Sequence, residues 1–243
     1  MQFSPQAILS ERADPDADSR LTEFAHDLAK THTVGKSRAE KNDLLERLKS
    51  WEQALSDANA IFKAVPAKDV AVSRAGEWML DNFYIVKQTF RQIEEDLPAG
   101  FLNQLPNLDG TPLKGHSRIF ALAWEWIGYS QSQIDLTQAA TFVQDYQQVT
   151  PLKIGELWAL PIMLRIGILE RLVYAVAELI GMDVPKGLSE IPSQFASSAL
   201  ANETIVANCF LSLRLLSATD WKDFFEQTSR VEQILRDDPA QIY

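Results

Sequence analysis

Carboxylates and aromatic rings occur together at two places in this sequence. At the first, four polar residues recur at helical spacing and so share one helix face: Glu77, Asp81, Tyr84 and Gln88. Trp78 and Asn82 lie beside them in the chain. Aromatic rings can stack on a sugar and carboxylates accept hydrogen bonds from hydroxyl groups, so this set could bind a carbohydrate. A solvated helix face with one buried tryptophan gives the same pattern, and we favour it.

At the second place Glu125 stands between Trp124 and Trp126. Apolar surroundings raise the pKa of a carboxyl group, and a raised pKa would suit this side chain to acid catalysis. Pairing with an arginine is the structural alternative, and Arg118 is the nearby candidate. We favour the ion pair.

Charged residues also interrupt helices that are otherwise apolar. The segment 154–181 carries Glu156 and Trp158 near its start and Arg165 and Glu170 further along, and Arg214 interrupts a later apolar segment. Burying a charge costs several kcal/mol unless it is paired, so ion pairs between helices are expected, with a ligand site as the alternative. Pro161 predicts that the helix starts, or is kinked, between Trp158 and Pro161.

Familiar catalytic motifs are not found. Cys209 is the single cysteine and has no activating base in its sequence neighbourhood, so a thiol nucleophile is not expected. The three histidines lack metal-ligand spacing, and neither a glycine-rich phosphate loop nor a Gly-x-Ser-x-Gly elbow occurs. The sequence predicts no bound metal and no cofactor.

These side chains must be positioned by helices, because apolar residues recur at helical spacing through most of the chain. Asn202 and Thr219 are predicted N-caps, and residues 101–115 form a predicted ordered loop. The fold class is all-α, a multi-helix orthogonal or bundle-like array without a significant β-sheet. The predicted helices are 21–30, 44–65, 73–97, 117–129, 136–148, 154–181, 203–217 and 220–236.

The domain organisation follows from breaks in these helices. Residues 1–20 are predicted to be a flexible tail, 21–181 the main helical domain and 182–201 a connecting segment. Residues 202–243 then form a C-terminal helical pair that packs on the main domain.

Composition excludes several classes of protein. A net charge of −10 disfavours nucleic-acid binding, which depends on clustered lysine and arginine. The apolar stretch 161–181 contains Arg165, Glu170, Arg171 and Glu178, so it is expected to be a buried helix and not a membrane span. No signal peptide opens the chain, and a single cysteine fits a reducing compartment.

Several segments, in this order, resemble the N-terminal region of bacterial cyclic β-1,2-glucan synthases. They are residues 77–85 (EWMLDNFYI), 96–98 (DLP), 121–125 (ALAWE), 151–158 (PLKIGELW), 161–165 (PIMLR), 208–214 and 220–226. The resemblance spans about residues 74–236, with a weaker fit over 21–65. One departure is the segment 128–131 (GYSQ), where that family is expected to have a histidine-containing turn.

The resemblance implies a piece of a large inner-membrane synthase that uses UDP-glucose. The transferase motif Gln-x-x-Arg-Trp of such enzymes is absent, which implies a non-catalytic accessory domain at the cytoplasmic face of the membrane. The implied partners are downstream transferase domains of the same polypeptide, together with β-1,2-glucan. The alternative is a carbohydrate-binding or glucan-processing module in which carboxylates and tryptophans converge on a sugar: Glu77, Asp81, Glu125 and Glu156 with Trp78, Trp124, Trp126 and Trp158.

Overall fold

The computed structural model describes residues 15–35, 44–64, 74–98, 100–109, 114–183, 185 and 201–230. The regular elements of this part of the chain are helices and one short two-stranded ladder, which confirms the all-α fold class. The elements are α1 (Pro15–Thr31), β1 (Val34–Gly35), α2 (Leu44–Ala64), α4 (Arg74–Asp96), the 3-10 helix η1 (Phe101–Gln104), β2 (Asn107–Leu108), α5 (Arg118–Tyr129), α6 (Leu136–Val149), α7 (Ile154–Ile180), α8 (Asn202–Ala218) and α9 (Trp221–Thr228).

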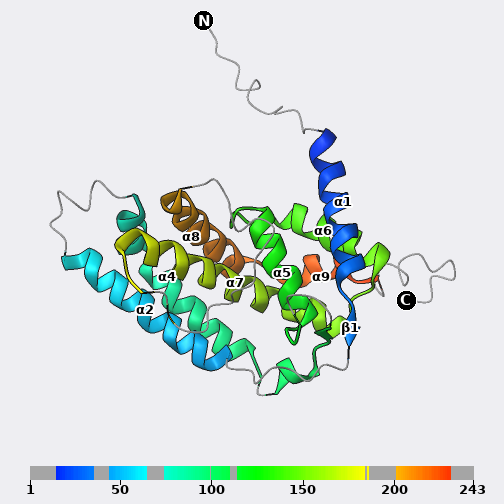
Figure 1. The fold of residues 1–243 in the computed structure, drawn as a ribbon, viewed down its shortest axis with the longest axis horizontal. Helices are drawn as coiled ribbons and strands as arrows, with labels where there is room; N and C mark the ends of the chain where they lie inside the picture. The colour runs from blue at the N-terminus through cyan, green and yellow to red at the C-terminus, as the bar shows by residue number, and fades with distance from the viewer. Residues whose placement is uncertain are drawn as a thin grey trace, which may run out of the picture.

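Helix α7 is the centre of the fold (Figure 1). It is apolar nearly all round, and such a helix is stable only when neighbours cover every side. Helices α2, α4, α5, α8 and α9 all pack against it. At Gly167 the contact with α5 is so close that an added Cβ would lie 2.5 Å from Ile127 Cδ1. None of the described helices is both long enough and apolar enough to cross a bilayer.

Helix α7 begins at Ile154, as in the predicted helix 154–181, and not between Trp158 and Pro161. It continues through Pro161. Glu156 fixes this start, because its Oε2 accepts a hydrogen bond of 2.9 Å from the backbone N–H of Lys153. A tertiary ion pair described below holds that carboxylate in place.

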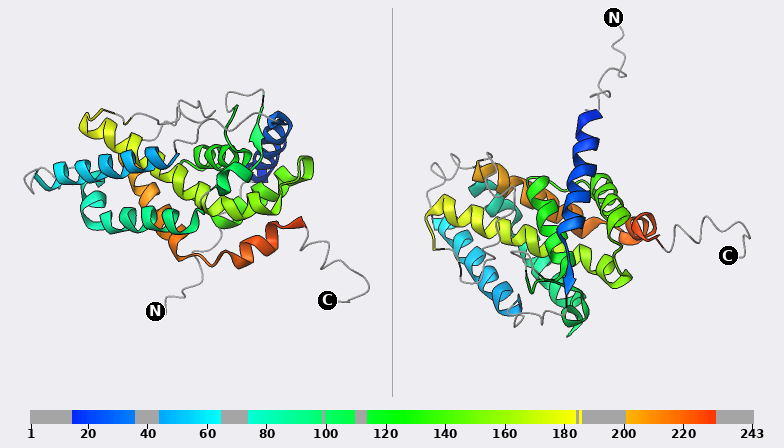
Figure 2. Two further views of the ribbon diagram at one scale, coloured as in Figure 1. Left: turned by 90° about the horizontal axis from the view of Figure 1, so that it is seen from below. Right: turned by 45° about the vertical axis from the view of Figure 1, so that its right-hand side comes forward.

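Helix α1 packs along α6 at the opposite end of the molecule from α2, and its N-terminal end stands clear of the body (Figures 1 and 2). Phe24 stacks on Tyr129 and Phe142 with ring centroids 5.1 and 5.5 Å apart. The helix begins at Pro15, so residues 15–20, predicted to be tail, are helical. Proline is favoured in the first turn because no intrahelical partner exists there for an N–H group.

Helix α9 ends earlier than predicted, at Thr228. Two side chains of α6 hydrogen-bond to this end. The Nε2 groups of Gln144 and Gln147 donate to the carbonyls of Gln227 and Thr228, at 2.8 and 2.7 Å. Carbonyls released by the helix end are thereby satisfied, and α9 is fixed on α6. The predicted continuation to residue 236 lies mostly outside the described residues.

Both predicted N-caps are displaced by one residue. Asp220 caps α9 by accepting from Lys222 N at 3.0 Å. Thr219 instead donates its hydroxyl to Leu215 O at the end of α8. Ala201 is the N-cap of α8, because the Asn202 side chain is drawn to Glu178 Oε2 on α7.

The turn between α5 and α6 is strained and is held from the side by α8. Gln131 and Ser132 have φ angles of 52° and 64°, in the left-handed region that disfavours residues with a side chain. Ser212 Oγ accepts from Ile134 N at 2.9 Å and donates to Ser132 O at 2.7 Å. One hydroxyl therefore satisfies two buried backbone groups of this turn.

Replacing Ser212 with alanine should lower the free energy of unfolding by about 2–3 kcal/mol, because it leaves both backbone groups buried without partners. Urea denaturation followed by circular dichroism measures the change. Ser217→Ala is the matched control, since that hydroxyl bonds only Arg214 O at an exposed site, and it should cost less than about 0.5 kcal/mol. Equal costs for the two variants would show that Ser212 does not hold the turn.

Candidate functional site

A buried ion pair joins the starts of α5 and α7. The guanidinium of Arg118 donates from Nε to Glu156 Oε1 at 2.8 Å and from Nη2 to Oε2 at 2.5 Å. The two side chains are 5% and 0% exposed. Arg118 Nη2 also donates to Pro151 O at 3.1 Å, and Glu156 accepts from Lys153 N. The pair is therefore bidentate and hydrogen-bonded on both sides, as a charge pair away from water must be.

Two further buried side chains extend this pair to α1 and α6. The Tyr146 hydroxyl, from α6, lies 3.0 Å from Nδ1 of His32, which follows α1. Burial, reinforced by the charge of Arg118, lowers the pKa of His32 to about 4. Burial raises the pKa of Tyr146, with Arg118 opposing it. Burial alone would lower the pKa of Arg118, but the hydrogen bond and charge of Glu156 outweigh it and raise that pKa.

We call His32, Arg118, Tyr146 and Glu156 the buried network. At neutral pH it consists of a neutral imidazole, a neutral phenol and one balanced ion pair. All four residues are buried, so a substrate cannot reach them in this fold. The arrangement therefore ties the segment after α1 to α5, α6 and α7.

Several sequence predictions change at this point. Arg118 pairs with Glu156 and not with Glu125, because Glu125 lies two helical turns further along α5. Glu156, Trp124 and Glu125 were candidates for a ligand or partner surface, yet they are 0%, 4% and 5% exposed. Close packing of α5 on α7 places them in the interior.

Arg165, on α7, lies in a second polar contact. It donates to Asp96 Oδ2 and to the carbonyl of Leu216, each at 3.2 Å. Burial lowers the pKa of Arg165, and Asp96 opposes that effect. The Arg165 side chain is 8% exposed and that of Asp96 is 52%, so this pair reaches the surface at one end. Glu170 is fully buried in the same helix.

Arg214 is the exception among the predicted buried charges. It is exposed on α8 and donates to Asn82 Oδ1 on α4 at 2.7 Å. The two helices that this bond joins carry three exposed apolar residues, Tyr84 on α4 and Leu211 and Leu215 on α8, which are 61%, 44% and 36% exposed. We call these three, with Arg214 and Asn82, the α4–α8 face. Asp81 is exposed on α4 one turn before Ile85, and Trp78 is half-buried against Phe210.

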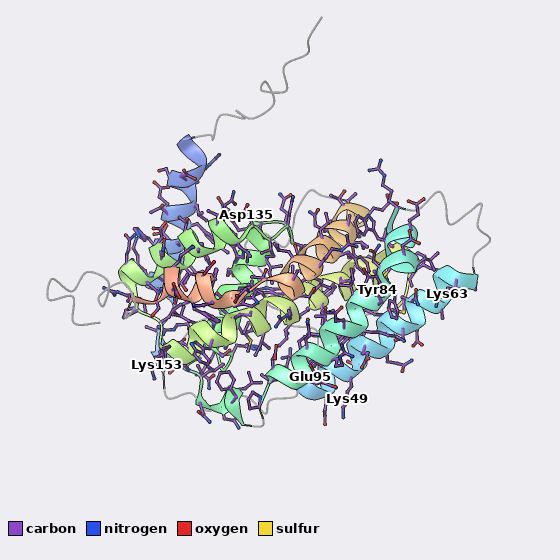
Figure 3. All side chains as sticks on the ribbon, turned by 180° about the vertical axis from the view of Figure 1, so that it is seen from behind. Lys49, Lys63, Tyr84, Glu95, Asp135 and Lys153 are labelled. Carbon is purple, nitrogen blue, oxygen red and sulfur yellow. The ribbon has the colours of Figure 1, made fainter. Side chains whose placement is uncertain are left out.

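Trp158 lies on a different part of the surface. It is 64% exposed near the start of α7, and its ring stacks with that of Phe225 on α9, with centroids 6.1 Å apart. Figure 3 places Lys153, which caps α7, and Tyr84 on opposite sides of the molecule. The predicted surface residues therefore divide into two separate groups.

The carboxylates of the alternative hypothesis do not converge. Glu77 and Asp81 are exposed on α4, whereas Glu125 and Glu156 are buried in α5 and α7. A two-carboxylate glycosidase needs both acids across one open cleft. Within the described residues, no group of three or more His, Cys, Asp or Glu side chains could hold a metal ion. Burial raises the pKa of the Cys209 thiol to about 12, which keeps it protonated and unreactive.

Sequence reasoning missed four residues that matter here. His32 and Tyr146 gave no signal, since they are separated from each other by 114 residues in sequence. Leu211 and Leu215 looked like core residues of an apolar helix. The i, i+4 spacing of those two leucines was the signal available, because it places them on one helix face.

Comparison with known proteins supports the resemblance seen in the motifs. No family model matches the chain. It is 36% identical over 104 residues to the cyclic beta-(1,2)-glucan synthase NdvB of Rhizobium meliloti (strain 1021). The match covers 42% of this chain and 4% of that much longer protein. The predicted similarity to a cyclic β-1,2-glucan synthase is thus confirmed over part of the chain.

Proposed function

We propose that this chain is a non-catalytic helical accessory domain of a cyclic β-1,2-glucan synthase, working at the cytoplasmic face of the inner membrane beside transferase domains of the same polypeptide. The similarity to the Rhizobium synthase supports the assignment to a cyclic β-1,2-glucan synthase. One observation carries the accessory role: Glu125 and Glu156, two of the carboxylates that an enzyme would need at an open site, are buried, and Glu156 is paired with Arg118.

The buried network gives such a domain its rigidity. It joins the end of α1 to α5, α6 and α7 through bonds between residues up to 114 apart in sequence. Removing one member would leave a buried group without its partner, so the helices favour a single arrangement. A rigid body suits a part whose task is to hold other domains in position.

The α4–α8 face is the surface through which we propose it binds the transferase. Tyr84, Leu211 and Leu215 expose apolar area that a protein partner would cover. Tyrosine and arginine are common anchors of protein interfaces, and Tyr84 and Arg214 both lie here. Leucine side chains offer no flat surface on which a sugar ring could stack, which favours a protein over a glucan at this face.

The test is a triple substitution, Tyr84→Ser with Leu211→Ser and Leu215→Ser, in the full-length synthase. Membranes carrying it should incorporate glucose from UDP-glucose into β-1,2-glucan several-fold more slowly at equal protein level, because the domain docks less well. Ile61→Ser is the control, as Ile61 is 44% exposed on α2 away from this face, and it should leave synthesis unchanged.

Two outcomes would count against the proposal. Unchanged synthesis in the triple variant would remove the α4–α8 face as a docking site. Transfer or hydrolysis of β-1,2-glucan by the isolated chain would show that it is itself an enzyme.

A further inference from the structure

Trp158 is the most exposed large apolar side chain of the described residues, and the fold holds it outward. It stands two residues after Glu156 in α7, and residues two apart point to nearly opposite sides of a helix. Glu156 is fixed inward by its bidentate pair with Arg118. Helix α7 therefore cannot rotate Trp158 into the core without breaking a buried ion pair.

The Trp158 ring belongs to a row of aromatic rings that crosses from α7 to α9. Its plane is within 21° of the plane of Phe225, and Phe225 is followed by Trp221 at 6.4 Å and 35°. Trp221 and Phe225 are one helical turn apart, so they share one side of α9. Gln144 and Gln147 fix α9 on α6 and so hold the row in place. We call Trp158, Trp221 and Phe225 the aromatic platform.

Polar groups border this platform. Lys222 and Glu226, each next in sequence to a platform residue, form an ion pair 3.8 Å apart on α9, with side chains 74% and 35% exposed. A flat apolar ring bordered by donors and acceptors matches a pyranose, which has an apolar C–H face and hydroxyl groups around its edge.

From this geometry we infer that the aromatic platform binds β-1,2-glucan, with a glucose ring stacked on Trp158 and its hydroxyl groups hydrogen-bonded to Lys222 and Glu226. The identity of the glucan rests on the proposed function. The platform would hold the glucan chain beside the transferase domain, which binds to the α4–α8 face.

The size of the patch favours a sugar over a protein. At the platform, the large apolar side chains that are well exposed are Trp158 and, one helical turn before it on α7, Ile154, at 64% and 61%. Covering both would bury no more than about 400 Å². A specific protein interface buries about 800 Å² on each partner. One sugar ring, in contrast, needs little more than the face of one indole.

Isothermal titration calorimetry of the purified chain with linear β-1,2-glucan oligosaccharides tests this inference. Trp158→Ala should weaken binding by about tenfold or more, and Trp158→Phe should retain part of it, because a smaller ring still stacks. Phe225→Ala should weaken binding less, since it removes the neighbouring ring only. Tyr84→Ala is the matched control, an exposed aromatic residue on the α4–α8 face, and should bind as the unmodified chain does.

Each other outcome overturns the inference. No heat of binding from the unmodified chain at millimolar oligosaccharide would exclude a glucan site, as would equal binding by Trp158→Ala. If Trp158→Ala in the full-length synthase instead releases a co-purifying protein, the platform is a protein contact. The triple substitution on the α4–α8 face tests the accessory role separately, so either proposal can fail while the other holds.

Discussion

Replacing Glu156 with glutamine should lower the free energy of unfolding by about 3–5 kcal/mol. The change keeps the shape of the side chain but removes its charge. Arg118, 5% exposed, is then left charged in the interior with no carboxylate. Urea or thermal unfolding followed by circular dichroism measures the loss, and a variant that fails to fold at all agrees with it.

A double-mutant cycle separates the ion pair from simple packing. Arg118→Met and Glu156→Met should each be strongly destabilising, whereas the double variant should recover much of the loss because no unpaired charge remains. Glu226→Gln is the control, since its pair with Lys222 is exposed, and it should change stability by less than about 1 kcal/mol. A cost below about 1 kcal/mol for Glu156→Gln would contradict the role given to the buried network.

Acidification should destabilise the protein through His32. The pKa of His32 is about 4 in the folded chain against an ordinary 6.5, so between these values the unfolded state binds a proton that the folded state does not. The contribution to stability is therefore complete above pH 6.5 and is lost progressively as the pH falls towards 4. One pKa unit corresponds to about 1.4 kcal/mol, so the total loss is about 3 kcal/mol.

The measurement is the free energy of unfolding at half-unit steps from pH 7.5 to 4. His32→Gln should flatten the curve between pH 6.5 and 4.5, even if it lowers stability at neutral pH. His26→Gln should keep the slope of the unmodified chain, because His26 is only half-buried and its ring contacts the Gln148 side chain at an exposed site, at 3.3 Å. The assignment to His32 fails if its replacement leaves the slope unchanged.

The two proposals together describe a rigid helical part with two outward surfaces. The buried network fixes α7, and α7 in turn determines that Trp158 faces solvent. The α4–α8 face is built on the other side of the same helix array, where α8 packs on both α4 and α7. Loss of the Arg118–Glu156 pair should therefore disturb both surfaces together.

The helices and their order were predictable from the sequence because they depend on local periodicity. Helix α4 begins and ends within one residue of its prediction, since a regular apolar stripe and Pro98 mark it. The N-caps were each displaced by one residue, because several side chains in a row could cap and distant contacts decided between them. The start of α1 was missed because its first turn is acidic and polar, with no apolar repeat to mark it.

The sequence by itself determined that charged residues would stand inside apolar helices and need partners, because burial of an unpaired charge is too costly. It could not determine which residues would pair. Arg118 and Glu156 are 38 residues apart, and His32 and Tyr146 are 114 apart, so only the packing of α1, α5, α6 and α7 brings them together. The same packing buried Trp124 and left Trp158 exposed, although each tryptophan stands within two residues of a glutamate. Exposure depends on which helix covers a side chain and not on its sequence neighbours.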